Sequence, residues 1–377
     1  MDTIPDLAVL FQHEISVLIK GRADEKFEEY VVLPSLKYGL PLKNEADKGY
    51  AFNVFSKYQE QLATVNQFDT DDVVLSAVGQ LNTPIWRRRR ATEGFDFIAI
   101  DETHLFNINE LHFFHHFTRK IGSFPISFSV DQAQGVGDRG WGEKDTFSVL
   151  FDASDEHDVI ERINTVFRCS PDITEFCASV LASGATLFTN FEDSLSEASS
   201  SFTSTDERRS QPLKYTQCVD DNNMVELAFK KAEDLAKETE SKPWEVLITT
   251  LSDDVLNKMK SFVEEKNKPV TLLDRRGDYI RIQRAEKSGH FVMGHADYVG
   301  GLEFNAVIIV GVDVGRVPLE NKSSNSASLN FAKYSAHNRL YVAASRARYA
   351  LEFLGVKGRG ASDLIKSSIE NKLVKFE

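Results

Sequence analysis

The stretch GLEFNAVIIVG, residues 301–311, contains a continuous apolar run, Val307–Val310, that ends at Gly311. A short run of β-branched residues bounded by turn residues is typical of a strand that is buried on both faces. Similar runs recur at Val246–Thr249, Val270–Leu273 and Leu351–Leu354, with helical patterns over Asp253–Glu265 and up to about Arg348. This alternation predicts βαβ units around a parallel sheet, and hence an α/β fold.

An earlier series of the same kind precedes this one. Apolar runs at Phe95–Ile100 and Ile126–Val130 alternate with helical patterns at Asn109–Ile121 and Pro171–Leu181. Residues 192–211 are rich in Ser, Thr and acidic residues, which bury little apolar surface, so they predict a flexible linker. We expect a helical and mixed region over 1–94, a partial first α/β domain over 95–190, a linker over 191–212 and a second domain over 213–377.

The composition fits a globular protein of about two domains, since 42% of its 377 residues are hydrophobic and 27% are charged. No apolar run approaches the roughly 20 residues of a membrane-spanning helix, and three cysteines without a CxxC pair indicate a reducing compartment. A cytoplasmic location is therefore expected. The net charge of -13 repels polyphosphates, so contact with nucleic acid requires a local basic groove.

The first group of residues suited to chemistry follows the strand predicted at Phe95–Ile100. Asp101 and Glu102 lie at its carboxyl end, where open α/β sheets bind their ligands. In a nucleotide hydrolase the first carboxylate holds Mg²⁺, and the second orients and deprotonates the attacking water. The alternative is a strand that simply ends in an acidic turn.

Further polar residues follow at two later positions. Asp131, Gln134 and Arg139 come after the strand predicted at Ile126–Val130. A carboxamide can hydrogen-bond a γ-phosphate or the attacking water, and a guanidinium can bind phosphate oxygens bidentately. Arg168 then precedes Ser170-Pro171, which equally fits a helix start with Ser170 as its cap and Arg168 solvated.

The order of these groups resembles superfamily 1 helicases of the UvrD, Rep and PcrA group, over about Phe68–Gly355. The family's strand ending in Asp-Glu is similar to Ile98–Glu102, its Gly-Asp-x-x-Gln motif to Val130–Gln134 with Arg139-Gly140, and its Tyr-Arg-Ser motif to Phe167–Ser170. Its fifth motif, a His followed by Lys-Gly-Leu-Glu-Phe, a strand and a glycine-rich turn, is similar to His295, Gly301–Phe304 and Val307–Pro318. Its sixth motif, Arg-Leu-x-Tyr-Val-x-x-Thr-Arg-Ala, is similar to Arg339–Ala347.

The resemblance implies two RecA-like domains with ATP and Mg²⁺ in the cleft between them, the metal being held by Asp101. Arg168 and Arg346 would be arginine fingers, and Gln134 would couple hydrolysis to cleft closure. The nucleotide would also contact Arg139, Gly301, Glu303 and Arg339, while His295 would face single-stranded DNA. The intact protein would then be an ATP-dependent DNA translocase or helicase.

The sequence departs from the family in its phosphate-binding loop, because it contains no Gly-Lys-Ser or Gly-Lys-Thr. In smaller departures, Val130 replaces a Gly, His104-Leu105 replaces Gln-Asp, and Gly300 replaces a Lys. Three explanations fit the absence of this loop. A partner protein supplies it, a segment is missing, or the chain has degenerated to a non-hydrolysing scaffold. Such a scaffold would bind nucleic acid or a nuclease partner, in DNA repair or in defence against foreign DNA. An unrelated metal-dependent α/β hydrolase would use Asp101 and Glu102 but leaves Arg346 unexplained.

Three further features have two interpretations each. Trp86 precedes four arginines, Arg87–Arg90, a cluster centred on Arg88 that suits base stacking and phosphate contact, or else a solvated helix end. His112, His115 and His116 share metal-ligand spacing, but the phenylalanines between them favour a packed helix. Lys357–Gly360 lacks the context of a phosphate loop and indicates a turn.

Overall fold

The computed structural model describes residues 4–36, 39–120, 125–131, 165–184, 199–200, 202–319 and 326–377. The chain divides into two compact units, each described below by itself. Unit 1 comprises Met1–Val159 and Lys322–Phe331, and unit 2 comprises Ile160–Asn321 and Ala332–Glu377. Within the described residues, no helix is both long enough and apolar enough to cross a membrane.

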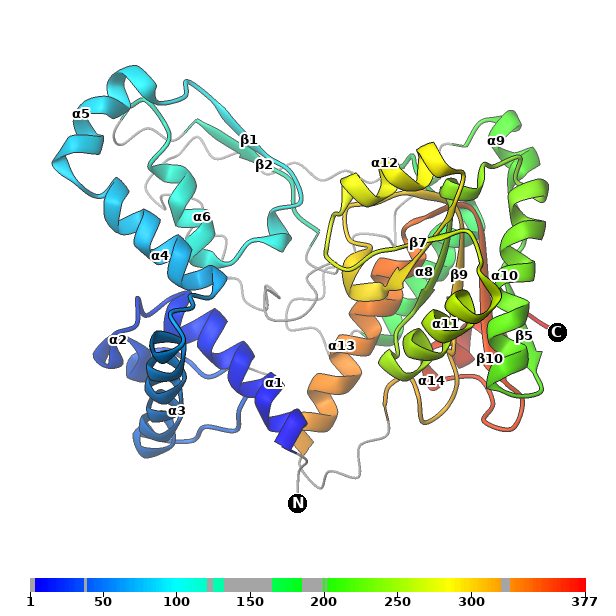
Figure 1. Ribbon diagram of the computed structural model, residues 1–377, viewed down its shortest axis with the longest axis horizontal. Helices are drawn as coiled ribbons and strands as arrows, with labels where there is room; N and C mark the ends of the chain where they lie inside the picture. Colours follow the sequence, from blue (N-terminus) through cyan, green and yellow to red (C-terminus); the bar gives the residue numbers. More distant parts are fainter. Residues whose placement is uncertain are drawn as a thin grey trace. The chain divides into compact units, whose positions relative to one another are not determined.

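Unit 2 is built on a seven-stranded sheet in the order β11-β5-β10-β9-β6-β8-β7, in which all neighbours are parallel (Figure 1). The interior strand β6 pairs with two neighbours, because Ile248 lies opposite Met293 of β8 and Ile308 of β9. The sheet confirms the predicted α/β fold with parallel strands. Its strands are β5 Lys214–Cys218, β6 Val246–Thr250, β7 Val270–Leu272, β8 Phe291–His295, β9 Phe304–Val310, β10 Ala347–Val356 and β11 Lys375–Phe376.

Helices cover both faces of this sheet. Alternate strand residues such as Ile248 and Ile308 pack against Met224 and Phe229 of α10 on one face. On the other face Phe176 of α8 lies against Phe353, with 5.0 Å between ring centroids. Each aliphatic side chain buried in this way contributes about 1.5–3 kcal/mol. The helices of unit 2 are α8 Pro171–Gly184, α9 Ser204–Arg209, α10 Asp221–Glu238, α11 Asp253–Lys266, α12 Tyr279–Ser288, the part of α13 (Ser326–Ala344) that begins at Ala332, and α14 Asp363–Glu370.

The sequence predicted β6, β7, β9, β10, α8, α11 and the end of α13, with differences at the ends of these elements. It did not predict β5, β8, β11, α9, α10, α12 and α14 as separate elements. Ser170 caps α8, because its hydroxyl accepts from the backbone N–H of Ile173, and Pro171 is the first helical residue, as predicted. The helix expected to end near Arg348 ends at Ala344, and residues 357–359 form a turn as predicted. A short parallel pair, β3 Thr165–Val166 and β4 Ser199–Ser200, lies outside the main sheet.

Unit 1 is mainly helical from Ile4 to Glu93 and then contains one small parallel sheet (Figure 1). Polar side chains cap α3, α4 and α5. At the start of α4, Asp69 and Asp72 form a capping box, in which each side chain accepts from the other residue's backbone N–H. The elements are α1 Ile4–Glu14, the π-helix η1 Ile15–Lys20, α2 Phe27–Val32, α3 Glu45–Thr64, α4 Thr70–Leu81, α5 Pro84–Glu93, β1 Ile98–Ile100, η2 Thr103–Leu105, α6 Ile108–His115 and β2 Ile126–Phe128.

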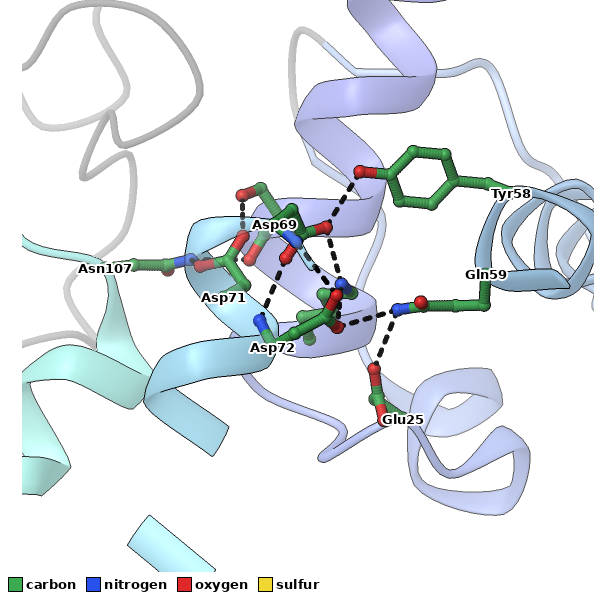
Figure 2. A network of polar contacts seen from close by, with 9 residues as sticks. Glu25, Tyr58, Gln59, Asp69, Asp71, Asp72 and Asn107 are labelled. Carbon is green, nitrogen blue, oxygen red and sulfur yellow. Dashed lines mark hydrogen bonds and ion pairs between the residues drawn. The ribbon is translucent and has the colours of Figure 1, made fainter. Parts of the chain in front are cut away.

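A buried lysine joins the helices of unit 1, and Figure 2 shows the polar side chains of the surrounding network, among them Tyr58, Asp69 and Asp72. Lys20, at the end of η1, is 1% exposed, and its Nζ lies 2.6 Å from Asp69 and 2.5 Å from Asp72. Tyr58 of α3 donates to Asp69, while Gln59 donates both to Asp72 and to Glu25. A buried charge is tolerated only when it is paired and hydrogen-bonded in this way. The network therefore holds α3 and α4 on the π-helix.

A second set of contacts extends this network toward α6. Ser16 donates to Asp71, and the side-chain amide of Asn107 donates to the carbonyl of Ser16 at 2.6 Å and to Asp71 at 3.5 Å. Asn107 directly precedes α6, so the π-helix is tied to the segment that follows β1 and η2.

Candidate functional site

The acidic pair of unit 1 lies at the carboxyl end of β1, as the sequence indicated. β1 and β2 are parallel and Ile100 lies opposite Phe128, so both strands end at the same edge. Asp101 is exposed there, and its Oδ1 accepts from the hydroxyl of Ser129 and from the backbone N–H of Glu102. Ser129, which sequence reasoning did not single out, therefore orients the Asp101 carboxylate.

Glu102 has an unusual backbone and a buried partner. Its φ of 54° lies in the left-handed region, which costs an L-residue about 1–2 kcal/mol. Its carboxylate lies 3.1 Å from Nε2 of His104, which is 2% exposed. Because His104 Nδ1 accepts the backbone N–H of Asp131, the ring proton belongs on Nε2 and is donated to Glu102. His104 thus fixes the position of Glu102.

Three predicted residues of unit 2 converge at the amino edge of its sheet. Glu303 directly precedes β9 and Arg346 directly precedes β10, and these strands are parallel neighbours. Arg168 reaches the same place, where it forms an ion pair with Glu303. The segment after Arg168 is held there because the backbone N–H of Ser170 donates to the carbonyl of Arg348.

Arg346 differs from Arg168 in exposure. The Arg346 side chain is fully buried, and it donates to the carbonyls of Val342 and Leu302 and to the hydroxyl of Ser345. The Arg168 side chain is 31% exposed. Arg346 therefore supports the segment that carries Glu303, whereas Arg168 is open to solvent.

Cys169 lies between these guanidinium groups. Burial raises the pKa of its thiol to about 11, although the positive charges of Arg168 and Arg346 act to lower it. Its sulfur lies 3.7 Å from the carbonyl of Ser345, so the thiol serves in packing. A neutral, buried thiol of this kind is a poor nucleophile.

Another group of unit 2 joins His295 and Arg339 through Asp297. Arg339 binds Asp297 through Nε at 2.7 Å and Nη2 at 2.8 Å, and Nδ1 of His295 lies 3.1 Å from the same carboxylate. Burial would raise the pKa of Asp297, but the adjacent imidazole of His295 and the charge of Arg339 lower that pKa well below its usual range. His295 and Arg339 were expected at the site, whereas nothing in the sequence distinguished Asp297 from other aspartates.

Gly301 lies in the turn between these two groups. Its φ of 76° is in the left-handed region that favours glycine. Its carbonyl accepts the hydroxyl of Tyr279 at 3.0 Å.

The tryptophan and arginine cluster on α5 is divided between two roles. Arg90 is buried, and it donates to the carbonyls of Thr118, His115 and Lys120, whereas Arg88 is exposed. Trp86 is half-buried and donates from Nε1 to the carbonyl of His116 at 2.8 Å. Arg90 and Trp86 therefore hold the end of α6, and Arg88 faces solvent.

The last predicted positions are Gln134, Arg139 and the histidines of α6. Gln134 and Arg139 lie outside the described residues. His112 and His115 have ring centroids 6.1 Å apart, but the part of the chain that the structure describes contains no group of three or more His, Cys, Asp or Glu residues that could hold a metal ion. Burial lowers the pKa of His112 and of His116, which keeps both rings neutral at pH 7.

The chain was compared with protein families, curated proteins and solved structures. No protein-family model and no curated protein matches the chain. Among solved structures, it is similar to the C-terminal domain of a possible DNA helicase from Lactobacillus plantarum WCFS1, with 14% identity and a TM-score of 0.37, over 56% of this chain and 98% of that one. The α/β fold stated above follows from the pairing and order of the strands, not from this similarity.

Proposed function

We propose that the chain is a component of an ATP-dependent DNA motor of the UvrD-like superfamily 1 type, with RecA-like units. The observation that carries the proposal is the convergence of Arg168, Glu303 and Arg346 at one edge of the unit 2 sheet. These residues come from three separate motifs, and packing alone does not require an arginine, a glutamate and a second arginine at one strand edge. A cationic group beside a carboxylate is suited to bind a nucleotide phosphate.

The acidic pair of unit 1 would hold the metal and activate the attacking water. The exposed Asp101 carboxylate suits Mg²⁺, which prefers carboxylate oxygens, and Mg²⁺ would neutralise phosphate charge when bound. Glu102, oriented by His104, would accept a proton from the attacking water. The left-handed backbone of Glu102 agrees with such a role, because strained backbone is concentrated at functional sites.

The two arginines would have different roles. Arg168 would contact the phosphates, because its side chain is partly exposed and its partner Glu303 is 60% exposed, so phosphate can replace the carboxylate. Arg346 would have to give up its hydrogen bonds to reach a nucleotide. We therefore assign to Arg346 first the positioning of Leu302 and Glu303, and contact with phosphate only after a rearrangement.

A partner protein or a missing segment would supply the phosphate-binding loop, because the sequence contains no Gly-Lys-Ser or Gly-Lys-Thr. The same observation favours a second candidate function, a helicase-fold scaffold that binds nucleic acid or a nuclease without hydrolysing ATP. The two functions differ in whether Arg168 ever contacts ATP.

ATP hydrolysis in the presence of single-stranded DNA tests the proposal, measured for the chain alone and for its complex with a protein that bears a P-loop. We expect hydrolysis in the complex, and we expect Arg168→Ala to lower it by at least about tenfold, since charge-assisted phosphate contacts are worth about 1.5–3 kcal/mol. Arg208→Ala, which removes an exposed arginine of α9, is the matched control. Absence of hydrolysis in both states excludes the motor and leaves the scaffold.

A further inference from the structure

An exposed basic and aromatic segment leaves the sheet of unit 2 after β7. We call residues 274–281, with the sequence DRRGDYIR, the arginine-tyrosine loop. Its residues 279–281 are the first of helix α12, and together with Arg284 of that helix the segment presents four arginines against two aspartates, in a chain whose net charge is -13. The side chains of Arg275, Tyr279 and Ile280 are largely exposed, Tyr279 at 60%. An exposed aromatic ring between arginines is not required by packing.

The loop lies at the carboxyl edge of the sheet, beside the loop that follows β8. β7 and β8 are parallel neighbours, so their following segments leave from the same edge, where α12 begins (Figure 1). Arg276 donates from Nε to the carbonyl of Asp297 at 3.3 Å, and Tyr279 donates to the carbonyl of Gly301. The two loops therefore form one surface, at the edge where α/β sheets bind ligands.

Glycines leave the backbone of this surface accessible. Gly277 has a φ of 63°, and a Cβ placed on it would meet no atom within 4 Å. A Cβ on Gly300 would come no closer than 3.8 Å to Arg276, and one on Gly301 would lie 3.7 Å from the hydroxyl of Tyr279. A phosphate can thus approach the peptide N–H groups and the guanidinium groups together.

A buried polar atom in the same surface also lacks a partner. The His295 side chain is 6% exposed, and its Nε2 has no hydrogen-bond partner among the residues that the structure describes. Buried polar atoms are nearly always hydrogen-bonded, so an atom without a partner indicates a missing ligand or water. His295 begins the loop that Arg276 contacts through Asp297.

We propose that the arginine-tyrosine loop binds single-stranded nucleic acid, with Arg275 and Arg276 on the phosphodiester backbone and Tyr279 stacked on an unpaired base. The inference rests on the proposed function, and it identifies the surface that would bind the single-stranded DNA. Single strands fit because only an unstacked base offers its face to an exposed ring. Asp278, the partner of Arg275, is buried, but the Arg275 side chain itself is 65% exposed. The ion pair of Arg281 with Asp274 is at the surface, so phosphate can reach both arginines.

Fluorescence anisotropy with a labelled oligothymidylate of about 20 nucleotides tests this, since single-strand sites span roughly 4–16 nucleotides per fold. We expect Arg275→Ala to weaken binding and to reduce the slope of log K against log salt by about 0.7, the value for one lost phosphate contact. Tyr279→Ala should weaken binding by about tenfold, and Tyr279→Phe, which keeps the ring, should bind nearly as well as the wild type.

Lys266→Ala is the matched control, because it removes one exposed positive charge at the end of α11. If Arg275→Ala and Tyr279→Ala bind the oligonucleotide as Lys266→Ala does, the inference is wrong, even where the complex still hydrolyses ATP with DNA. If ATP hydrolysis is absent but Arg275→Ala and Tyr279→Ala, unlike Lys266→Ala, lose binding of the oligonucleotide, the inference stands and the motor function is wrong.

Discussion

Arg339 and Asp297 bind each other through two parallel hydrogen bonds of 2.7 and 2.8 Å, although 42 residues separate them in the chain. The pair joins α13 to the turn after β8, and His295 contacts the same carboxylate. One aspartate therefore fixes two of the residues that the family resemblance assigned to nucleotide and DNA.

Replacing Asp297 should lower stability in a pH-dependent way. Because the folded-state pKa of Asp297 lies below its usual value of about 3.9, its contribution is complete above that value and is lost as the pH falls below it. We expect Asp297→Asn to lower the free energy of unfolding by about 1–3 kcal/mol at pH 7. Urea denaturation at several pH values should show this difference shrinking toward pH 3; a difference that does not change with pH contradicts the assignment.

Lys20→Met should strongly destabilise unit 1. The substitution keeps the volume but leaves Asp69 and Asp72 without their buried cation, which costs about 3–5 kcal/mol. Lys26→Met is the control, because Lys26 pairs at the surface and should change stability by no more than about 0.5 kcal/mol. Equal urea midpoints for the two variants would show that the network does not hold these helices.

Replacing Arg90 and replacing Arg88, which lie in the same helix, should have different effects on stability. Arg90→Ala removes hydrogen bonds to buried carbonyls and should cost about 2–3 kcal/mol of stability, whereas Arg88→Ala should be near neutral. Thermal unfolding compares them. If Arg88 contacts DNA, as the sequence indicated, Arg88→Ala should weaken oligonucleotide binding with no change in the melting temperature, and unchanged binding argues against that role.

Glu102→Gln should abolish proton transfer but keep nucleotide affinity. General-base catalysis contributes about 10²–10⁴-fold, so hydrolysis by the complex with a P-loop protein should fall by that factor while binding of Mg-ATP changes little. Asp96→Asn removes an equivalent charge from an exposed position near β1 and serves as the control. If Glu102→Gln keeps full activity, Glu102 is not the general base of the reaction.

The three cysteines should resist modification in the folded protein. All are buried, and burial raises the pKa of both Cys169 and Cys218 to about 11, so little thiolate exists at pH 8. A chromogenic disulfide reagent should detect no rapidly reacting thiol in the native state and three in urea. Fast reaction of one thiol without denaturant would contradict this burial.

Much of the local structure was predictable from the sequence because it depends on short-range pattern. Val307–Val310 indicated a buried strand, and Ser170-Pro171 indicated a helix start, since apolar continuity and capping chemistry act over a few residues. The ends of elements were less predictable, as with the strand expected from Phe95 that begins at Ile98. A strand begins and ends where its hydrogen-bond partners in the neighbouring strand do. The hydrophobic pattern of the sequence does not specify these partners.

By itself the sequence determined the α/β class, the parallel strands and the candidate residues from Asp101 to Arg346, because the periodicity of apolar residues and the residue types are properties of the sequence alone. Only the tertiary structure decided that Arg346 is buried while Arg168 is open, that His104 holds Glu102, and that Asp297 joins His295 to Arg339. The roles of these residues depend on exposure and on partners tens of residues away, and both arise only when the strands and helices pack.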